Sequence, residues 1–234
     1  MKFLVSIVIP VYKEVDNINH IVQSIYKSLI NIIDYEIIFV DDNSADGSLQ
    51  VCSDLGRKHP VKMVVRTDKR GLSSAVIDGI NLAKGEYIVV MDGDLSHPAS
   101  SIPSMTKKLS FNDADFVLGS RYISGGNIDK NWSIFRYLSS RLATLLALPL
   151  VSVKDPMSGF FSFKKKSVAN LNLLSPIGYK IGLEIMVKYN FKKIIEEPIV
   201  FTDRVYGESK FGFREQVNYL RHILRLYKYK LKHD

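Results

Sequence analysis

Residues 87–94 read Tyr-Ile-Val-Val-Met-Asp-Gly-Asp, an apolar run that ends in two carboxylates. Such a run predicts a strand covered on both faces, as in a parallel sheet. Two carboxylates one residue apart at the end of a strand can share one hard divalent cation. Asp92 and Asp94 therefore predict a Mg²⁺ or Mn²⁺ site. The alternative is an ordinary Asp-Gly turn, with Asp94 capping a helix that starts near His97 and Pro98.

The same alternation of apolar runs and longer helical patterns fills the first half of the chain. Strands are expected at residues 4–9, 35–40, 61–65 and 87–91, with a further short strand at 116–119. This alternation predicts βαβ units and a mainly parallel sheet flanked by helices. Because the sequence shows no repeat or linker, we expect one α/β domain.

Polar residues follow the predicted strands, where the ligand site of an open α/β sheet forms. Asp41 and Asp42 end the second predicted strand. A carboxylate at this position can accept hydrogen bonds from a ribose or a base edge. The alternative is that Asp42 or Ser44 caps the next helix, a role that Asp46 is also expected to fill.

Composition limits the class of protein. Among 234 residues, 46% are hydrophobic and the formal net charge is +8. This hydrophobic share can bury a full core, and the charge favours a nucleic acid, a phosphorylated substrate or an acidic membrane face as partner. Cys52 is the only cysteine, so no intrachain disulfide can form and a reducing compartment is expected. No aromatic and basic RNA-binding motif is present, so we expect no nucleic-acid partner.

Two segments of the second half are candidates for contact with a membrane. Residues 132–151 combine aromatic side chains, arginines and a leucine-rich end, which suits either a helix in the membrane interface or an amphipathic core helix. Residues 211–234 form a basic amphipathic pattern that suits an anionic surface. The longest charge-free apolar run, 142–153, contains Pro149 and is well short of the roughly 20 residues of a spanning helix. Membrane association is therefore expected to be peripheral.

Several motifs together resemble those of one enzyme family. In order they are IVIPVYKE, FVDDNSADGS, the stretch 70–85, VVMDGDLSHP, LGSRY, DPMSGFF and RVYGESKF. Their order and spacing resemble family 2 glycosyltransferases of the GT-A fold, and within that family the dolichyl-phosphate and polyprenyl-phosphate mannosyltransferases. The resemblance covers residues from about 4 to 215, and the later motifs are the more specific to the polyprenyl-phosphate branch.

The resemblance implies which residues bind a nucleotide-sugar donor. The nucleoside would be held by Pro10, Tyr12, Glu14 and Asp42. The metal and the donor diphosphate would meet at Asp92-Gly93-Asp94. Where some relatives have a glutamine as a further ligand, this chain has Ser96. Ser96, water or a donor phosphate would then complete the metal's ligands.

Phosphate-binding residues are implied in the same way. The implied catalytic residues are Asp94, Arg121, Arg204 and Lys210. Arg204 and Lys210 would bind the donor phosphates, and Arg121 would bind the acceptor phosphate together with Arg136 and Ser140. The last two lie four residues apart, on one face of a helix. Arginine suits this task because its planar fork makes paired hydrogen bonds to phosphate oxygens. The alternative for each basic residue is a solvated surface side chain.

The implied activity is inverting, metal-dependent transfer of a hexose, with mannose from GDP-mannose as the first expectation, to a polyprenyl or dolichyl monophosphate. The acceptor phosphate is already anionic, so no strong base is needed. Residues 1–122 are expected to bind the nucleotide sugar, and 123–234 the acceptor and the cytoplasmic face of a membrane. Many relatives continue into transmembrane helices where this chain stops, so the amphipathic surface or a membrane-protein partner would bring it to the lipid.

Other functions stay open at this point. The donor could be a UDP-sugar, or the acceptor could be a carbohydrate hydroxyl, which would need a carboxylate base such as Asp155. A non-catalytic nucleotide-sugar-binding subunit of a membrane complex is a further alternative. The presence of Asp92, Asp94, Arg121 and Lys210 argues against that last reading.

Overall fold

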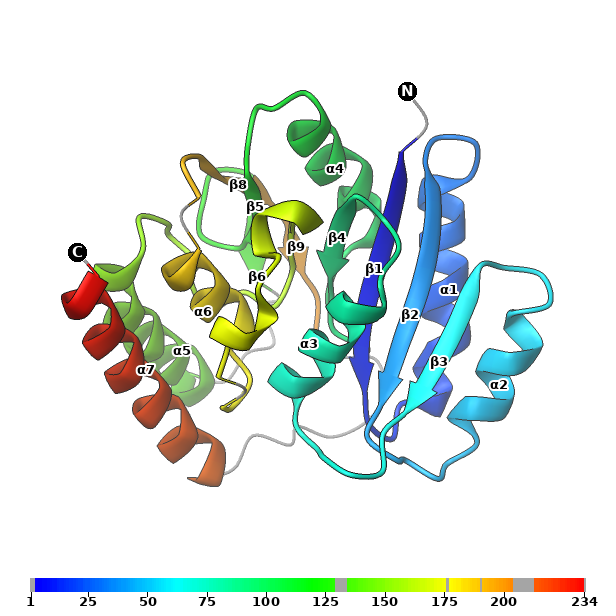
Figure 1. The fold of residues 1–234 in the computed structure, drawn as a ribbon, viewed down its shortest axis with the longest axis horizontal. Coiled ribbons are helices and arrows are strands. Elements are labelled where there is room, and N and C mark those ends of the chain that lie inside the picture. Colours follow the sequence, from blue (N-terminus) through cyan, green and yellow to red (C-terminus); the bar gives the residue numbers. More distant parts are fainter. Residues whose placement is uncertain (1–2, 129–133, 176, 190, 204–212, 234) are drawn as a thin grey trace.

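The computed structural model describes residues 3–128, 134–175, 177–189, 191–203 and 213–233. Its strands are β1 (Leu4–Val11), β2 (Asp34–Asp41), β3 (Val61–Val65), β4 (Tyr87–Val90), β5 (Phe116–Ser120), β6 (Asn127–Ile128), β7 (Phe161–Lys164), β8 (Ile194–Pro198) and β9 (Val200–Phe201). Its α-helices are α1 (Val15–Leu29), α2 (Ser48–Leu55), α3 (Leu72–Leu82), α4 (Ile102–Ser110), α5 (Ile134–Ala147), α6 (Ile181–Lys188) and α7 (Phe213–His233). Helices flank a central sheet on both faces (Figure 1).

The first half of the chain forms the parallel part of the central sheet. β1 lies between β2 and β4 and is parallel to both, and β3 extends the sheet beyond β2. The interiors of β1, β2 and β4 are buried, as the continuous apolar runs predict, whereas β3, at the outer end of this part of the sheet, is only half-buried. The mainly parallel α/β sheet is confirmed. Because the strands are parallel, the loops that follow them meet at one edge.

The second half of the chain contributes to the same sheet. Among the described residues the strand order is β3-β2-β1-β4-β7-β5-β8, and β6 pairs separately with β9. β7 is antiparallel to both β4 and β5, whereas β5 and β8 are parallel. The sheet is therefore mixed, as expected. Because β7 is antiparallel to β4, its first residue, Phe161, pairs with Val90 at the end of β4. The segment that precedes β7 therefore lies next to the loop that follows β4.

Alternating strand residues divide the core into two layers. Ile7 and Ile9 face the layer that contains α1, α2 and α4, whereas Val8 faces the layer that contains α3, α6 and α7. α1 covers its layer with apolar residues at a helical spacing, and all of them are buried: Ile18, Ile21, Val22, Ile25 and Leu29.

α5 is apolar on two faces. Toward the core it buries Thr144 and Ala147, and α7 packs on it: the Tyr219 hydroxyl donates a hydrogen bond to the Ala143 carbonyl (2.6 Å). The two helices lie side by side in Figure 1. The outer face exposes three leucines, each by 58–62%: Leu138, Leu142 and Leu145. Core packing of this helix is therefore confirmed, and its exposed apolar face leaves the membrane-interface role a prediction. None of the helices in the described residues has the length and apolarity required to cross a bilayer.

Candidate active site

Asp92 and Asp94 lie in the loop after β4, at the carboxyl edge of the sheet. Leu95 has a φ of 65°, which is uncommon for a residue with a side chain. This turn directs Ser96 back to Asp94, whose Oδ1 accepts hydrogen bonds from the Ser96 amide (3.1 Å) and hydroxyl (2.6 Å). The helical segment that follows begins after Pro98 with no side-chain cap. Asp94 is thus oriented by Ser96 and caps no helix.

His97 supports the first carboxylate of this motif. Its ring is buried, stacks on Phe160 with the ring centres 5.2 Å apart, and accepts a hydrogen bond at Nδ1 from the Asp92 amide (3.0 Å). The neutral ring therefore carries its proton on Nε2, which lies 3.8 Å from Asp92 Oδ2. Burial lowers the pKa of His97; the carboxylates of the motif raise it, and Arg121 and Lys180 lower it. His97 therefore precedes the helical segment that begins after Pro98 and also positions Asp92 through the hydrogen bond to its amide.

The carboxylates of this loop fit a divalent cation that also takes ligands from outside the protein. The Asp92 side chain is 35% exposed, and carboxylate oxygens are hard ligands that suit Mg²⁺ or Mn²⁺. The described residues contain no group of three or more His, Cys, Asp or Glu able to hold a metal ion. The Ser96 hydroxyl donates to Asp94. Water and substrate oxygens would supply the remaining ligands.

The ends of three strands meet beside this loop. The Asp42 amide donates a hydrogen bond to the Val11 carbonyl (3.2 Å). Gly93 lies so close to β1 that an added Cβ would be 2.7 Å from Val11 Cγ1 and 3.3 Å from the Pro10 carbonyl oxygen. A side chain at residue 93 would therefore push the loop that carries Asp92 and Asp94 away from β1. Pro10, Asp42 and Gly93, all predicted to contact the donor, occupy one edge.

Tyr12 and Glu14 continue this edge after β1. The Tyr12 ring lies beneath two cations, with the Arg70 guanidinium carbon 5.4 Å and the Lys13 Nζ 5.6 Å from its centre. Glu14 precedes α1, and its carboxylate accepts a hydrogen bond from the side-chain Nδ2 of Asn17 (2.6 Å). Their contacts with a nucleoside remain predictions.

Arg66 holds the Asp42 carboxylate in place. Arg66 donates to Asp42 Oδ1 through both Nε (2.8 Å) and Nη2, and the Gly71 amide donates to Oδ2 (2.7 Å). The Arg66 side chain is only 3% exposed and also donates to Ser74 (2.8 Å) and Asp78 (3.1 Å). Asp42 therefore caps no helix. It joins the end of β2 to the loop between β3 and α3.

Replacing Arg66 with lysine is expected to weaken nucleoside-diphosphate binding by about tenfold, or ~1.4 kcal/mol. Lysine keeps the charge but lacks the planar fork that bonds Asp42, Ser74 and Asp78 together. Calorimetric titration with GDP and with UDP measures the change. Arg57→Lys is the matched control, because Arg57 is 77% exposed. Equal affinity of the Arg66 and Arg57 variants would contradict the positioning role.

Arg121 lies at the end of β5 and is paired with Asp155. Its Nε and Nη2 each donate to one carboxylate oxygen at 2.7 Å, and its backbone amide donates to Oδ2 (3.0 Å). The Asp155 side chain is fully buried and that of Arg121 is 8% exposed. Burial opposes the charge on Arg121, but the hydrogen bonds and charge of Asp155 outweigh burial and raise the pKa of the guanidinium. Arg121 is therefore a fixed cation beside the carboxylate loop.

A groove starts next to this cation and follows the exposed face of α5. The Tyr122 ring lies between Arg121 (5.2 Å) and Arg141 (4.9 Å), and its hydroxyl is 3.3 Å from the Ser140 hydroxyl. The groove has a volume of about 550 Å³, and its lining includes Tyr122, Arg141, Leu138, Leu142 and Leu145. Ser140, predicted to bind an acceptor phosphate, thus contacts Tyr122, which both lines the apolar groove and lies beside Arg121.

Three predicted phosphate-binding side chains cannot be placed. Arg204 and Lys210 lie outside the described residues, and so does the side chain of Arg136 in α5. The structure adds residues that the sequence did not single out: Arg66, Arg70, Arg141 and Lys180. Arg66 directly follows the third strand, and that position was a usable signal. Arg70 begins the motif stretch 70–85, whereas Arg141 and Lys180 have no motif or strand end to mark them.

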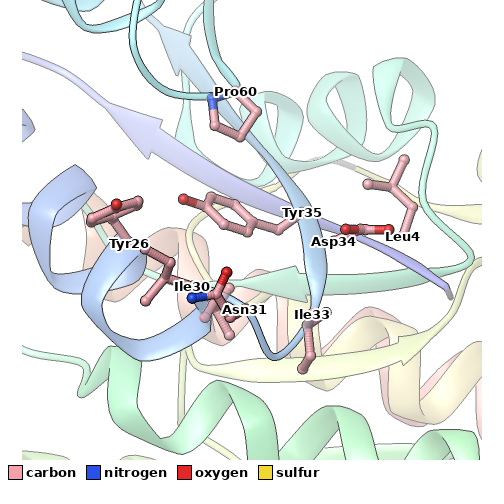
Figure 2. Close-up of a pocket in the computed structure, with 9 residues that line it drawn as sticks. Leu4, Tyr26, Ile30, Asn31, Ile33, Asp34, Tyr35 and Pro60 are labelled. Atoms are coloured by element: carbon pink, nitrogen blue, oxygen red, sulfur yellow. The ribbon is translucent and has the colours of Figure 1, made fainter.

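A second hollow lies at the opposite edge of the sheet. Figure 2 shows it between the end of α1 and the start of β2, with Tyr26, Tyr35 and Pro60 around it. Its volume is about 270 Å³, and Asp34 is the only acidic residue in its lining. Because the carboxyl ends of the parallel strands are at the other edge, the carboxylate loop is the better candidate active site.

The strand-end loops and the mixed sheet match a known protein family. The model of "Glycosyl transferase family 2" matches residues 6–171. The chain belongs to glycosyl transferase family 2. Its α/β sheet is therefore a GT-A fold, as the sequence motifs predict.

Curated relatives of this family 2 chain include two dolichol-phosphate mannosyltransferases. The protein from Pyrococcus furiosus is 42% identical over 229 residues, which cover 96% of this chain and 64% of that relative. The protein from Saccharomyces cerevisiae is 39% identical over 235 residues, which cover 96% of this chain and 87% of the relative. The chain thus spans 64% of the length of the first and most of the second.

Solved structures of glycosyltransferases share the fold. Glucosyl-3-phosphoglycerate synthase from Mycobacterium tuberculosis, solved with Mn²⁺, UDP and glucosyl-3-phosphoglycerate, has a TM-score of 0.68 at 16% identity, covering 97% of this chain and 80% of that one. A mannosyltransferase from Pyrobaculum calidifontis, solved with GDP-Man and Mn²⁺, has a TM-score of 0.66 at 20% identity, covering 96% and 65%.

Proposed function

We propose that this chain transfers mannose from GDP-mannose to a polyprenyl or dolichyl monophosphate, with inversion at the anomeric carbon. The observation that carries this proposal is the passage from a polar site into an apolar groove at Tyr122, because a lipid phosphate needs both surfaces. The dolichol-phosphate mannosyltransferase relatives support mannose as the sugar and dolichol phosphate as the acceptor. Residues 1–122 would bind the donor, and 123–234 the acceptor and the membrane.

In this reaction an acceptor phosphate oxygen attacks the anomeric carbon as the bond from that carbon to the GDP oxygen breaks. The products are polyprenyl-phosphate mannose and GDP. Asp92 and Asp94 would hold Mg²⁺ or Mn²⁺, which neutralises charge on the departing diphosphate. Arg121 would direct its positive charge toward the phosphates, and the strand-end loops would align the reacting atoms. We propose Arg204 and Lys210 as further diphosphate ligands, and Arg136 and Ser140 as acceptor ligands.

The position of Asp155 favours a phosphate acceptor over a carbohydrate hydroxyl. A hydroxyl acceptor needs a base within hydrogen-bond reach of its proton. Asp155 is fully buried, and both of its oxygens accept hydrogen bonds from Arg121. Its role in this arrangement is to fix Arg121. A phosphate monoester is already anionic at neutral pH and needs no such base.

A transfer assay tests the proposed function. The full chain is incubated with Mn²⁺ or Mg²⁺, a panel of GDP- and UDP-sugars, and a short polyprenyl phosphate in detergent, and products are identified by mass. We expect a lipid-phosphate hexose from GDP-mannose and none after chelation of the metal. Product from a UDP-sugar alone would overturn the donor assignment. Donor hydrolysis without a lipid product would overturn the acceptor assignment.

We also propose that the exposed face of α5 rests on an anionic membrane. The double variant Leu142→Glu with Leu145→Glu is expected to lower vesicle binding by at least about tenfold. It removes exposed apolar area that the bilayer would bury, and it adds negative charge next to an anionic surface. Co-sedimentation with vesicles of phosphatidylglycerol and phosphatidylcholine measures the loss. Leu49→Glu is the control, since Leu49 is 55% exposed and belongs to α2, a helix on the other side of the molecule from α5 (Figure 1). Equal binding by both variants would contradict this orientation.

A further inference from the structure

Lys180, which directly precedes α6, reaches into the wall of the candidate active site. Its Nζ donates a hydrogen bond to the Met157 carbonyl (2.5 Å) and lies 4.7 Å from the centre of the Tyr179 ring. No motif of the sequence marks this lysine, and neither the metal site nor the acceptor groove described above uses it. Its surroundings explain what it can bind.

The segment that Lys180 contacts also borders the other groups of the site. Two residues before Met157, Asp155 forms the paired hydrogen bonds to Arg121. Two residues after it, Gly159 lies so close to Asp92 that an added Cβ would be 3.1 and 3.2 Å from the two carboxylate oxygens. The short loop that accepts the Lys180 hydrogen bond therefore also contacts Arg121 and Asp92, and Lys180 interacts electrostatically with both.

The charge of Lys180 acts on this site. Burial lowers the pKa of Lys180, Arg121 lowers it as well, and Asp92 and Asp155 raise it; together they bring the pKa to about 8. Lys180 also contributes to the lowered pKa of His97, the residue that supports Asp92. The ammonium thus lies within electrostatic range of the groups that flank the carboxylate loop.

Lys180 differs from Arg121 in how its charge is balanced. Arg121 shares a two-oxygen ion pair with Asp155, whereas none of the ion pairs between described residues includes Lys180. Its described hydrogen bond is to a neutral carbonyl. Lys180 is half-buried, and holding a cation partly out of water without an anionic partner is unfavourable, a cost that a bound anion offsets. The location of Lys180 beside Asp92 identifies the kind of anion, because the substrates there carry phosphates.

We propose that Lys180 binds a phosphate oxygen of the substrates in this site. The inference rests on the proposed function for the identity of the substrates. An ammonium donates to phosphate as a compact point charge, and Met157 holds this one at the edge of the carboxylate loop. Both the donor diphosphate and the acceptor phosphate present the same chemistry, and the variants below separate them.

The test uses Lys180→Gln and Lys180→Met in the full chain. Glutamine keeps an N–H donor for the Met157 carbonyl but has no charge, whereas methionine keeps the length and has neither. Both variants are expected to show one of two changes of about tenfold or more. Either GDP binds more weakly in the presence of Mn²⁺, as measured by calorimetry, or the KM for polyprenyl phosphate rises. Lys166→Met is the control, because Lys166 is exposed. Lys180→Arg keeps the charge and should recover most of the loss.

The pattern of losses identifies the phosphate. Weaker GDP binding assigns Lys180 to the donor, and a raised acceptor KM with unchanged GDP binding assigns it to the acceptor. If Lys180→Gln matches the wild type in both measurements, Lys180 only holds the loop and the inference is wrong. The proposed function fails separately: a wild-type chain that binds GDP or UDP but makes no lipid product overturns that proposal, while the comparison of nucleotide affinities still tests Lys180.

Discussion

Replacing Asp94 with alanine is expected to lower turnover in the mannosyl-transfer assay by about a thousandfold. Several kcal/mol of stabilisation of the departing diphosphate depend on a correctly held cation, and each ~1.4 kcal/mol corresponds to a factor of ten in rate. Asp94 supplies one of the two carboxylates in the loop after β4, and Ser96 orients it. The initial rate at saturating substrates measures the effect.

Metal binding by the same variant separates this role from damage to the fold. Mn²⁺ affinity, measured by electron paramagnetic resonance without any sugar donor, should fall along with turnover, whereas the thermal unfolding temperature should change little. Asp113→Ala is the matched control, because Asp113 is an exposed acidic residue outside this loop. Undiminished turnover in the Asp94 variant would rule out its role in metal-assisted transfer.

Replacing Asp155 with alanine is expected to destabilise the protein by about 3–5 kcal/mol. The change leaves Arg121 as a largely buried cation without its ion-pair partner, and removing one member of a buried pair costs this much. Chemical denaturation monitored by the fluorescence of Trp132 and by circular dichroism measures the free energy of unfolding. Turnover should fall as well, because the Arg121 guanidinium loses its fixed orientation.

Asp54→Ala is the matched control for the ion pair. Asp54 pairs with Arg57 at 3.5 Å on the surface, and their side chains are 54% and 77% exposed. Breaking such a pair should change the free energy of unfolding by at most about 1 kcal/mol. Similar losses in the two variants would contradict the structural importance of the Arg121 pair. A folded Asp155→Asn protein that binds donor normally but cannot turn over would instead support a catalytic base and a hydroxyl acceptor.

The parallel half of the sheet could be predicted from the sequence because its strands are continuous apolar runs, buried in β1, β2 and β4 and half-buried in β3. Of these runs, 61–65 and 87–91 agree with β3 and β4 to within one residue. The position of the carboxylate loop was predictable for the same reason, since Asp92 and Asp94 directly follow a run of this kind. β7 was not predicted as a strand, because its residues Phe161–Lys164 lie within a longer segment without a clear period.

The contacts that shape the site could not be predicted, because they join distant segments. Arg121 meets Asp155 across 34 residues, and Arg66 meets Asp42 across 24. Lys180 reaches Met157 across 23 residues, from a position that has no motif. Pattern and propensity describe local structure, whereas these pairs depend on the order of strands in the sheet. The second face of α5 was ambiguous because its leucines suit both a core and a membrane.

The central position of β7 has a consequence for protein synthesis. On the ribosome, a nascent chain that ends before residue 161 can pair β1, β2, β3 and β4, but β4 then has an unpaired edge. β5 has no link to that sheet until β7 has emerged, since β7 joins it to β4. The pairing of these distant strands is therefore a late folding step, and until then the exposed edge of β4 is a place where chaperones can bind and aggregation can start.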